Sequence, residues 1–288
     1  MSGSTTGQAP SAWEDAVRWL RDNPETQRLV IDGYYDDPLI GAAERYRSSP
    51  EWAAIRALLD GRCGNALDVG AGRGITAYAF ARDGHTVTAL EPDSSELVGA
   101  GAIRQLFGQA GLPVQIVETF SERLPFESAA FDVVFARAVL HHTTDLEQAC
   151  KEFYRVLKPG GLLLAIREHV ISQDEDLPKF FDIHPLHHRY GGENAFLLSR
   201  YEEAIRRSGL DLVKTLAPFE SAMNYAPYTL QELRNQMAAR LFSSSAKLAG
   251  LFAKLLSVRL VWSVVVALLN RTDHRPGRLY SFVAVRRG

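Results

Sequence analysis

The stretch Ala66-Leu-Asp-Val-Gly-Ala-Gly-Arg-Gly74 decides the fold. A short apolar run leads into a glycine-rich turn, and helical spacing begins directly after it. Gly70, Gly72 and Gly74 can adopt positive φ and let a ligand approach the backbone closely, while the helix start behind them offers unpaired N–H groups. Seventeen residues after Gly74, at the end of the next apolar run, Glu91 is placed to accept the two hydroxyls of a ribose. Together these features predict a nucleotide site at a turn between strand and helix.

Outward from this turn, short apolar runs alternate with helical patterns along residues 63–220, the predicted core. The apolar runs lie at 66–69, 86–90, 114–117, 131–136, 162–167 and 212–216, and the helical patterns lie at 75–82, 94–107, 146–157 and 199–208. The runs are continuous rather than alternating, which is typical of strands buried on both faces of a parallel sheet. We therefore predict an α/β fold: a Rossmann-like, seven-stranded, mostly parallel sheet whose last strand is the run at 279–285.

The segments on either side of this core predict helices. Residues 11–62 form a predicted N-terminal helical cover, and residues 221–277 form a predicted helical insertion before the last strand, at 278–288. The small and polar residues 1–10 predict a disordered lead-in. Candidates for a lid over the ligand, with core packing as the alternative, are the tyrosines Tyr34, Tyr35 and Tyr46.

The formal net charge of −2 hides an asymmetry along the chain. Residues 221–288 carry ten Lys/Arg and two acidic residues, whereas residues 1–220 carry an excess of acid. An acidic core disfavours a groove that follows phosphates, so we expect no nucleic-acid partner. The two cysteines, Cys63 and Cys150, exclude a disulfide framework and fit a reducing, cytoplasmic setting.

Further motifs follow the glycine turn in a fixed order. They are Leu124-Pro-Phe126 with Phe131-Asp-Val-Val134, then Arg137-Ala-Val-Leu-His-His142, then Arg155-Val-Leu-Lys-Pro-Gly-Gly161. With these motifs, residues 40–220 resemble the class I S-adenosylmethionine-dependent methyltransferases, especially the small-molecule group called type 11. A nicotinamide dehydrogenase is the rival interpretation, but its fingerprint is G-x-G-x-x-G, whereas this turn is G-x-G-x-G.

The resemblance implies S-adenosylmethionine as the cofactor. It places Asp68 near the methionine amino group, the glycines along the cofactor and Glu91 at the ribose. Where the family commonly has an acid followed by alanine, this chain has Phe120 and Ser121, so ring stacking and backbone groups are the expected adenine contacts. The candidate cofactor-binding residues are Asp68, Gly70, Gly72, Gly74, Glu91, Pro92, Phe120, Ser121, Glu122 and Arg137.

Histidines gather where an acceptor is expected, because ligands of open α/β sheets bind at the carboxyl ends of the strands. Arg167-Glu-His169 stands at the predicted end of the fifth strand, and a histidine-rich stretch covers residues 181–194. The catalytic candidates are His169, our first choice for a general base, His142 and His188. The candidates for contacts with the substrate are His141, Glu168, His184, His187, Tyr190 and Glu193.

Two other interpretations of these histidines stay open. His184 and His188 have the i, i+4 spacing of metal ligands on a helix, but Pro185 disfavours a regular helix there, so we predict no metal. The histidines can also serve as caps and hydrogen-bonded loop residues. On the favoured interpretation, the protein transfers a methyl group to an oxygen or nitrogen atom of a small-molecule or lipid- or glycan-linked acceptor. A non-catalytic S-adenosylmethionine-binding sensor or scaffold is the alternative.

In the basic carboxyl-terminal part, basic residues recur every seven positions. Arg240, Lys247 and Lys254 recur at that interval and a leucine follows each of them, which predicts a helix with an apolar stripe and a basic flank. The first interpretation is that this insertion docks on the core and covers the substrate site, because the last strand ties it down. Peripheral contact with the inner face of a membrane through residues 229–270 is the second, and a homodimer interface is the third.

Overall fold

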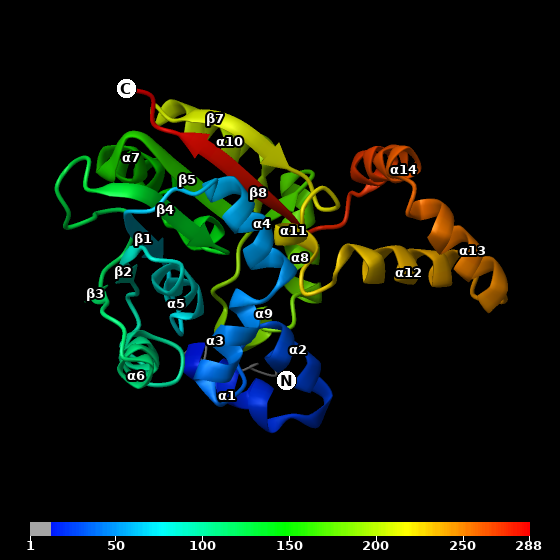
Figure 1. Ribbon diagram of the computed structural model, residues 1–288, viewed down its shortest axis with the longest axis horizontal. Helices are drawn as coiled ribbons and strands as arrows, with labels where there is room; N and C mark the ends of the chain where they lie inside the picture. Colours follow the sequence, from blue (N-terminus) through cyan, green and yellow to red (C-terminus); the bar gives the residue numbers. More distant parts are fainter. Residues whose placement is uncertain (1–12) are drawn as a thin grey trace, which may run out of the picture.

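The computed structural model describes residues 13–288, so the predicted lead-in at 1–10 lies outside the described residues. Its centre is an eight-stranded sheet in the order β3-β2-β1-β4-β5-β8-β7, with β6 pairing against β5 (Figure 1). The strands are β1 (Asn65–Val69), β2 (Thr86–Leu90), β3 (Gln115–Val117), β4 (Phe131–Arg137), β5 (Leu157–Ile171), β6 (Phe196–Leu197), β7 (Asp211–Leu216) and β8 (Arg278–Val285). Neighbouring strands are parallel except where β8 pairs with β5 and β7. The predicted Rossmann-like sheet is confirmed, with the two-residue β6 as an additional strand.

Helices cover both faces of the sheet, which is why the strands read as continuous apolar runs. Along β4, Val133 and Phe135 belong to one buried cluster, whereas Val134 and Ala136 belong to another. The helices on the first face are α3 (Leu39–Arg47), α4 (Pro50–Leu59), α5 (Ile75–Arg82) and α6 (Ala100–Ala110), and those on the second are α7 (Leu146–Val156) and α10 (Leu198–Arg207). The period of two along each strand therefore supplies side chains to two cores.

The N-terminal helices are tied to the glycine turn by an arginine. Helices α1 (Trp13–Asp22) and α2 (Gln27–Asp32) precede α3 in the chain. From the turn, Arg73 donates hydrogen bonds at 2.9 Å to the backbone carbonyls of Tyr34 and Asp36. It also pairs with the carboxylate of Asp37 at 2.6 Å. The loop between α2 and α3 is therefore held directly against the predicted nucleotide site.

The helices between the strands are close to the predicted ones, with one late start. Helix α5 spans the predicted residues, whereas α6 begins at Ala100 rather than at 94. Gly99 is extended and lies so close to the preceding turn that a Cβ there would sit 2.1 Å from the carbonyl oxygen of Asp93. Two further helices, α8 (Leu177–Ile183) and α9 (His187–Tyr190), fall in the histidine-rich segment.

Strand β5 is longer than predicted, and this changes the position of a candidate base. The strand continues to Ile171 rather than ending at 167, because β8 keeps pairing with it beyond a bulge between Ala165 and Glu168. Within the bulge, Arg167 has a φ of +60°. His169 therefore lies inside the strand rather than at its end, and the bulge helps to set the direction of its side chain.

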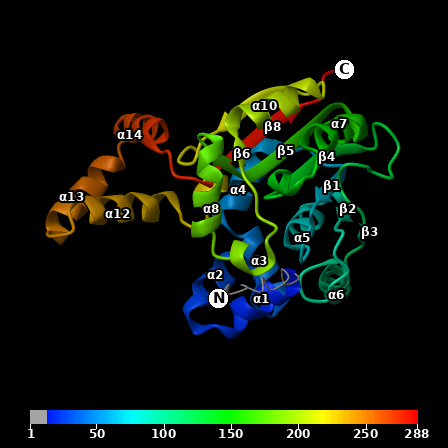
Figure 2. The ribbon, with the colours of Figure 1, turned by 180° about the vertical axis from the view of Figure 1, so that it is seen from behind.

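The helical insertion leaves the body of the molecule as an arm. Helices α12 (Leu230–Leu241), α13 (Ala246–Leu256) and α14 (Arg259–Thr272) project away from the sheet (Figures 1 and 2). The short α11 (Ala222–Tyr225) packs on the core instead, where Ser281 of β8 donates a hydrogen bond to Asn224. The prediction that the whole insertion docks over the substrate site is therefore wrong for these three helices.

A turn also divides the helix that the spacing of seven predicts. Residues 242–245 separate α12 from α13, and Ser245 caps α13 by accepting the N–H of Leu248. Arg240 and Lys247 consequently lie on different helices, because a local capping residue overrides the continuous pattern. Within residues 13–288 no single helix is long and apolar enough to cross a membrane, and α13 with α14 passes that test only as a pair bent by 99°.

Candidate active site

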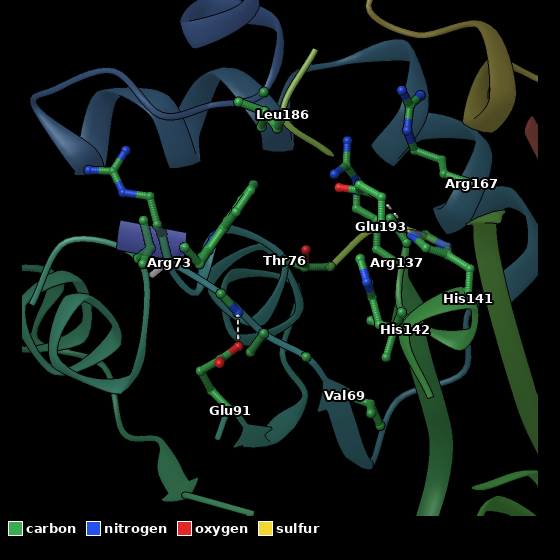
Figure 3. A pocket seen from close by; sticks show the side chains of 18 of the residues that line it. Val69, Arg73, Thr76, Glu91, Arg137, His141, His142, Arg167, Leu186 and Glu193 are labelled. Carbon is green, nitrogen blue, oxygen red and sulfur yellow. Dashed lines mark hydrogen bonds and ion pairs between the residues drawn. The ribbon is translucent and has the colours of Figure 1, made fainter. Parts of the chain in front are cut away.

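A cavity of about 650 Å³ opens at the carboxyl ends of the parallel strands (Figure 3). Its walls come from the glycine turn after β1, the ends of β2 and β4, the N-terminal helices and the segment that joins α8 to β6. In Figure 3, Glu91 lies on one side of this cavity, and His141, His142 and Glu193 lie on the other. The candidate cofactor residues and the candidate acceptor residues therefore share one space.

The structure brings most of the predicted site residues to this cavity. Those on its wall are Gly70, Gly72, Glu91, Pro92, Phe120, Ser121, Glu122, Arg137, His141, His142, His169, His184, Tyr190 and Glu193. The predicted residues that lie off the wall are Asp68, Gly74, Glu168, His187 and His188. Of the tyrosines considered for a lid, Tyr34 and Tyr35 line the cavity, whereas Tyr46 is buried in the core.

The glycine turn holds the candidate ribose-binding acid in place. Gly72 has a φ of +54° and donates its N–H to Oε2 of Glu91 at 2.7 Å, while the N–H of Asp93 donates to Oε1 at 2.9 Å. Gly70 has a φ of +62°, and a Cβ added there would lie 2.6 Å from Val139. The turn therefore presents backbone without side chains beside a fixed carboxylate, and at Gly70 a larger side chain would collide with Val139.

Asp68 and Gly74 support the turn from behind the cavity wall. Asp68 is 1% exposed, its Oδ2 atom has no hydrogen-bond partner among the described residues, and burial raises its pKa to about 8. Gly74 has a φ of +81° and is the N-cap of α5, and a Cβ added there would lie 3.1 Å from Ile103. Asp68 was predicted to contact the amino group of the cofactor, which would place it on the cavity wall. In the structure it lies behind that wall. An unpaired buried carboxyl oxygen nevertheless suits a cationic partner.

Another part of the wall carries the residues predicted to meet adenine. Phe120 is 71% exposed, so its ring is accessible for stacking on a planar ligand. Glu122 is engaged by the backbone, because the N–H of Thr144 donates to its Oε1 atom at 2.8 Å. The hydroxyl of Ser121 lies 3.3 Å from the other oxygen of the same carboxylate. Glu122 is therefore partly occupied by protein groups, whereas the ring of Phe120 is not covered.

Arg137 lines the cavity but is held by an acid that the sequence did not reveal. Its Nε atom lies 2.6 Å from Oε1 of Glu51, which is fully buried in α4 and is also 3.5 Å from Arg167. Tyr46 donates its hydroxyl to the same carboxylate at 3.1 Å. No local pattern joins residues 86 positions apart, so this pair could not be predicted. Arg73 was missed as well, although an arginine between two glycines of the turn was an available signal.

Four polar side chains converge on the side of the cavity where an acceptor was predicted: His141, His169, His184 and Glu193. Nε2 of His141 is 3.8 Å from Oε2 of Glu193, and Nδ1 of His184 is 3.7 Å from Oε1 of that carboxylate. The ring centroids of His141 and His169 are 4.7 Å apart. Burial lowers the pKa of all three imidazoles, to about 3 for His169 and about 4 for His184, so the rings are neutral at neutral pH.

Glu168 orients this cluster from outside the cavity. It is fully buried, and its Oε2 atom lies 2.7 Å from Nδ1 of His141. The same carboxylate accepts the backbone N–H groups of Val139, Leu140 and His141 at 3.1 Å. Glu168, which was predicted as a contact with the substrate, therefore lies behind the cavity wall with no exposed face. Its role is to position His141.

His187 and His188 lie outside the cavity. The ring of His187 stacks on Phe181 with centroids 3.9 Å apart, and His188 is exposed on α9. The structure therefore does not bring His188, predicted as catalytic, or His187, predicted as a substrate contact, to the cavity. The i, i+4 spacing of His184 and His188 does not place the two residues on one helix. His184 follows the end of α8, and His188 belongs to the next helix, α9.

Comparisons with known proteins identify the central part of the chain. Residues 67–165 match the family described as methyltransferase domain. UbiE, a ubiquinone/menaquinone biosynthesis C-methyltransferase of Vibrio parahaemolyticus, is 36% identical over 125 residues, which cover 42% of this chain and 47% of that protein. YcgJ, an uncharacterized methyltransferase of Bacillus subtilis, is 31% identical over 122 residues, covering 40% and 44% respectively.

Solved structures share the fold across nearly the whole chain. The geranyl diphosphate C-methyltransferase of Streptomyces coelicolor has a TM-score of 0.58 at 15% identity and covers 99% of this chain and 92% of its own. The [4+2]-cyclase SpnF has a TM-score of 0.53 at 22% identity, with coverages of 86% and 82%. At such identities the likeness establishes the fold alone.

Residues 67–165 therefore form a class I S-adenosylmethionine-dependent methyltransferase domain. Within that class the domain belongs to the type 11 family, and S-adenosylmethionine is its cofactor. The match spans under half the length of UbiE and of YcgJ. The residues present fit the cofactor, because they offer open space beside the backbone at Gly72, a fixed carboxylate at Glu91 and an unpaired buried oxygen at Asp68.

Proposed function

We propose that the protein transfers a methyl group from S-adenosylmethionine to an oxygen or nitrogen atom of a polar acceptor. The observation that carries this proposal is one cavity with the glycine turn and Glu91 on one side and a cluster of neutral imidazoles on the other. S-Adenosylmethionine supplies a methyl group bonded to a positively charged sulfur, and its transfer leaves S-adenosylhomocysteine. The protein has to orient the acceptor and remove its proton.

For the cofactor, we assign Glu91 to the ribose hydroxyls and Phe120 to the adenine ring. Each oxygen of Glu91 accepts one backbone N–H, so the carboxylate is fixed before a ligand arrives. Gly70 and Gly72 allow the ligand to approach the turn closely because neither has a Cβ. This half of the cavity binds and orients, and it contains no group that the reaction has to protonate or deprotonate.

We assign the general base to His142 rather than to His169. His142 lines the cavity, and its Nδ1 atom lies 2.8 Å from the carbonyl oxygen of Gly192, which can only accept a hydrogen bond. Nδ1 therefore carries the hydrogen, and Nε2 keeps a lone pair for the proton of the acceptor. His142 is exposed to solvent, whereas burial lowers the pKa of His169 to about 3 and makes it a weak base.

Formation of S-adenosylhomocysteine in the presence of small-molecule and lipid fractions from cells tests this function. We expect turnover with at least one fraction, and we expect mass spectrometry of the product to place the new methyl group on oxygen or nitrogen. A methyl group on carbon would contradict the acceptor atom proposed here. Cofactor binding without turnover in any fraction would instead support a sensor or scaffold.

Two variants separate cofactor binding from proton removal. Glu91→Gln should weaken cofactor binding about ten- to a hundredfold in calorimetry, because hydrogen bonds to a charged carboxylate contribute about 1.5–3 kcal/mol. His142→Gln should lower kcat by about a hundredfold or more at unchanged cofactor affinity. His188→Gln, at an exposed position outside the cavity, is the control. Wild-type affinity in the first variant, or wild-type kcat in the second, would overturn the corresponding assignment.

We further propose that the arm of α12, α13 and α14 rests on an anionic membrane surface, where a lipid-linked acceptor would be available. Between Glu232 and Asp273 the chain carries six basic residues and no acidic one. Large apolar side chains are exposed along the same segment: Leu241, Leu248, Leu251, Leu255, Val258, Leu260, Val264 and Leu268. Exposed apolar groups beside positive charges supply the two components of an interfacial membrane contact.

Sedimentation with phosphatidylglycerol vesicles tests the membrane contact. We expect binding at low salt, weaker binding at high salt and little binding to phosphatidylcholine vesicles. Leu251→Ser combined with Leu260→Ser should reduce binding, whereas Val213→Ser, at an exposed position on β7, should not. Absence of binding to anionic vesicles at low salt would overturn this proposal, as would a stable dimer in solution that covers the arm.

A further inference from the structure

Three side chains on the acceptor side of the cavity place metal-ligating atoms close together. Each of His141, His169 and Glu193 offers one such atom, and these atoms all lie within 4.8 Å of one another. His141 and Glu193 are buried, so the group is not a chance cluster of solvated surface residues. We propose that these three residues bind a divalent transition metal ion, for which Zn²⁺ is the reference, with His184 adjacent as a fourth ligand.

Hydrogen bonds behind the imidazoles prepare two of the rings as ligands. Nδ1 of His141 faces the carboxylate of Glu168 at 2.7 Å, and Nδ1 of His169 faces the carbonyl oxygen of Gly277 at 2.9 Å. Because both partners are acceptors, each Nδ1 carries the hydrogen and each Nε2 has a lone pair to offer. Histidine ligands of protein-bound metals typically donate their other N–H to a carboxylate or a backbone carbonyl in this way.

The carboxylate and the third imidazole complete the group. Tyr190 donates its hydroxyl to Oε1 of Glu193, and Oε2 of Glu193 lies 3.8 Å from Nε2 of His141. Nδ1 of His184 is 3.7 Å from Oε1 of Glu193, is buried, and has no hydrogen-bond partner among the described residues. A buried nitrogen without a partner is costly, and coordination to an ion would satisfy it.

The dimensions and the chemistry of the group select the kind of ion. Ligand atoms of a tetrahedral ion with bonds of about 2.0–2.1 Å are roughly 3.3 Å apart, so side-chain shifts of under about 1 Å would close the group around it. Imidazole nitrogens with one carboxylate suit Zn²⁺ or Fe²⁺, whereas Mg²⁺ and Ca²⁺ prefer oxygen ligands.

The ion would have a defined part in the reaction, and this part rests on the proposed function. His141, His169 and Glu193 all line the cavity, so an ion held by these three residues and His184 would become five-coordinate when an acceptor atom binds it from that space. An oxygen or nitrogen atom of the acceptor that binds there would be held in place and would release its proton more readily. His142, which is not one of the proposed ligands, remains the base that receives the proton.

Titration of chelator-treated protein with Zn²⁺ in a calorimeter tests the site directly. We expect one ion per chain, and Co²⁺ substitution should give the visible absorption of a nitrogen- and oxygen-ligated ion. His169→Ala and Glu193→Gln should each weaken Zn²⁺ binding at least tenfold, and Tyr190→Phe should weaken it about 10–100-fold by releasing the carboxylate. His188→Ala, outside the cavity, should bind Zn²⁺ as the wild type does. Absence of stoichiometric binding, or wild-type affinity in His169→Ala, would overturn the site.

Failure of this site can be distinguished from failure of the proposed function. Full methyl transfer by metal-free protein that binds no Zn²⁺ would overturn the metal site and leave the methyltransferase function in place. Stoichiometric Zn²⁺ binding that depends on His169 and Glu193, in a protein that binds the cofactor but never forms S-adenosylhomocysteine, would retain the site and overturn the function.

Discussion

Nδ1 of His141 lies 2.7 Å from Oε2 of Glu168, and both side chains are buried. The same carboxylate accepts three backbone N–H groups from the turn that follows β4, including that of His141 itself. One acid in β5 therefore fixes both the path of that turn and the tautomer of an imidazole at the cavity wall. Because three backbone N–H groups and the ring of His141 share the carboxylate of Glu168, a substitution at Glu168 should change both the free energy of unfolding and the geometry of the site.

Glu168→Gln should lower the free energy of unfolding by about 1–3 kcal/mol for each buried N–H group left without an acceptor. The amide offers one oxygen where the carboxylate offers two, and its NH₂ group faces donors. Urea unfolding measures the loss, with Glu147→Gln at an exposed position of α7 as the control. Equal stability of the Glu168 and Glu147 variants would contradict this account of the turn.

Gly70→Ala should destabilise the fold by about 1–3 kcal/mol and also weaken cofactor binding. Position 70 has a φ of +62°, and the added Cβ would lie 2.6 Å from a methyl group of Val139. The matched change Gly108→Ala, in α6 with no atom within 4 Å of the new Cβ, should stabilise by up to about 1 kcal/mol. Thermal unfolding compares the two, and opposite signs are the expected result.

Glu51→Gln should cost about 3–5 kcal/mol, because it leaves the charged groups of Arg137 and Arg167 without their buried counter-ion. The exposed pair of Arg104 and Glu118 provides the comparison, and Glu118→Gln should cost under about 1 kcal/mol. Denaturant unfolding of both variants measures the difference. A small loss in Glu51→Gln would show that the two arginines find other partners.

Asp68→Asn should change how stability depends on pH. Burial raises the pKa of Asp68 to about 8, so between about pH 4 and pH 8 the folded protein keeps a proton that the unfolded chain releases. The stability that this group contributes is fully present below about pH 4 and is lost as pH rises through 8. The variant lacks this titration, so its free energy of unfolding should fall less than that of the wild type between about pH 5 and pH 8. Parallel curves would contradict the raised pKa.

The sequence by itself determined the sheet and the position of the proposed cofactor-binding residues. Continuous apolar runs predicted strands with two covered faces, and β4 shows why, since its alternate residues supply two separate cores. The glycine turn and Glu91 could also be predicted, because each directly follows its own strand. Parallel pairing of β1 with β2 then brings the two strand ends together without further information. These features could be predicted because each depends on residues that are close together in the sequence.

Only the tertiary structure decided which histidines meet and how the arm lies. His141, His169 and His184 come from the turn after β4, from within β5 and from the end of α8, and no local pattern relates them. A bulge between Ala165 and Glu168 changes which face of the strand a side chain takes, and residue spacing does not reveal it. The position of the arm could not be predicted either. An amphipathic pattern shows that a helix has an apolar face, but what covers that face depends on packing between segments that are distant in the sequence.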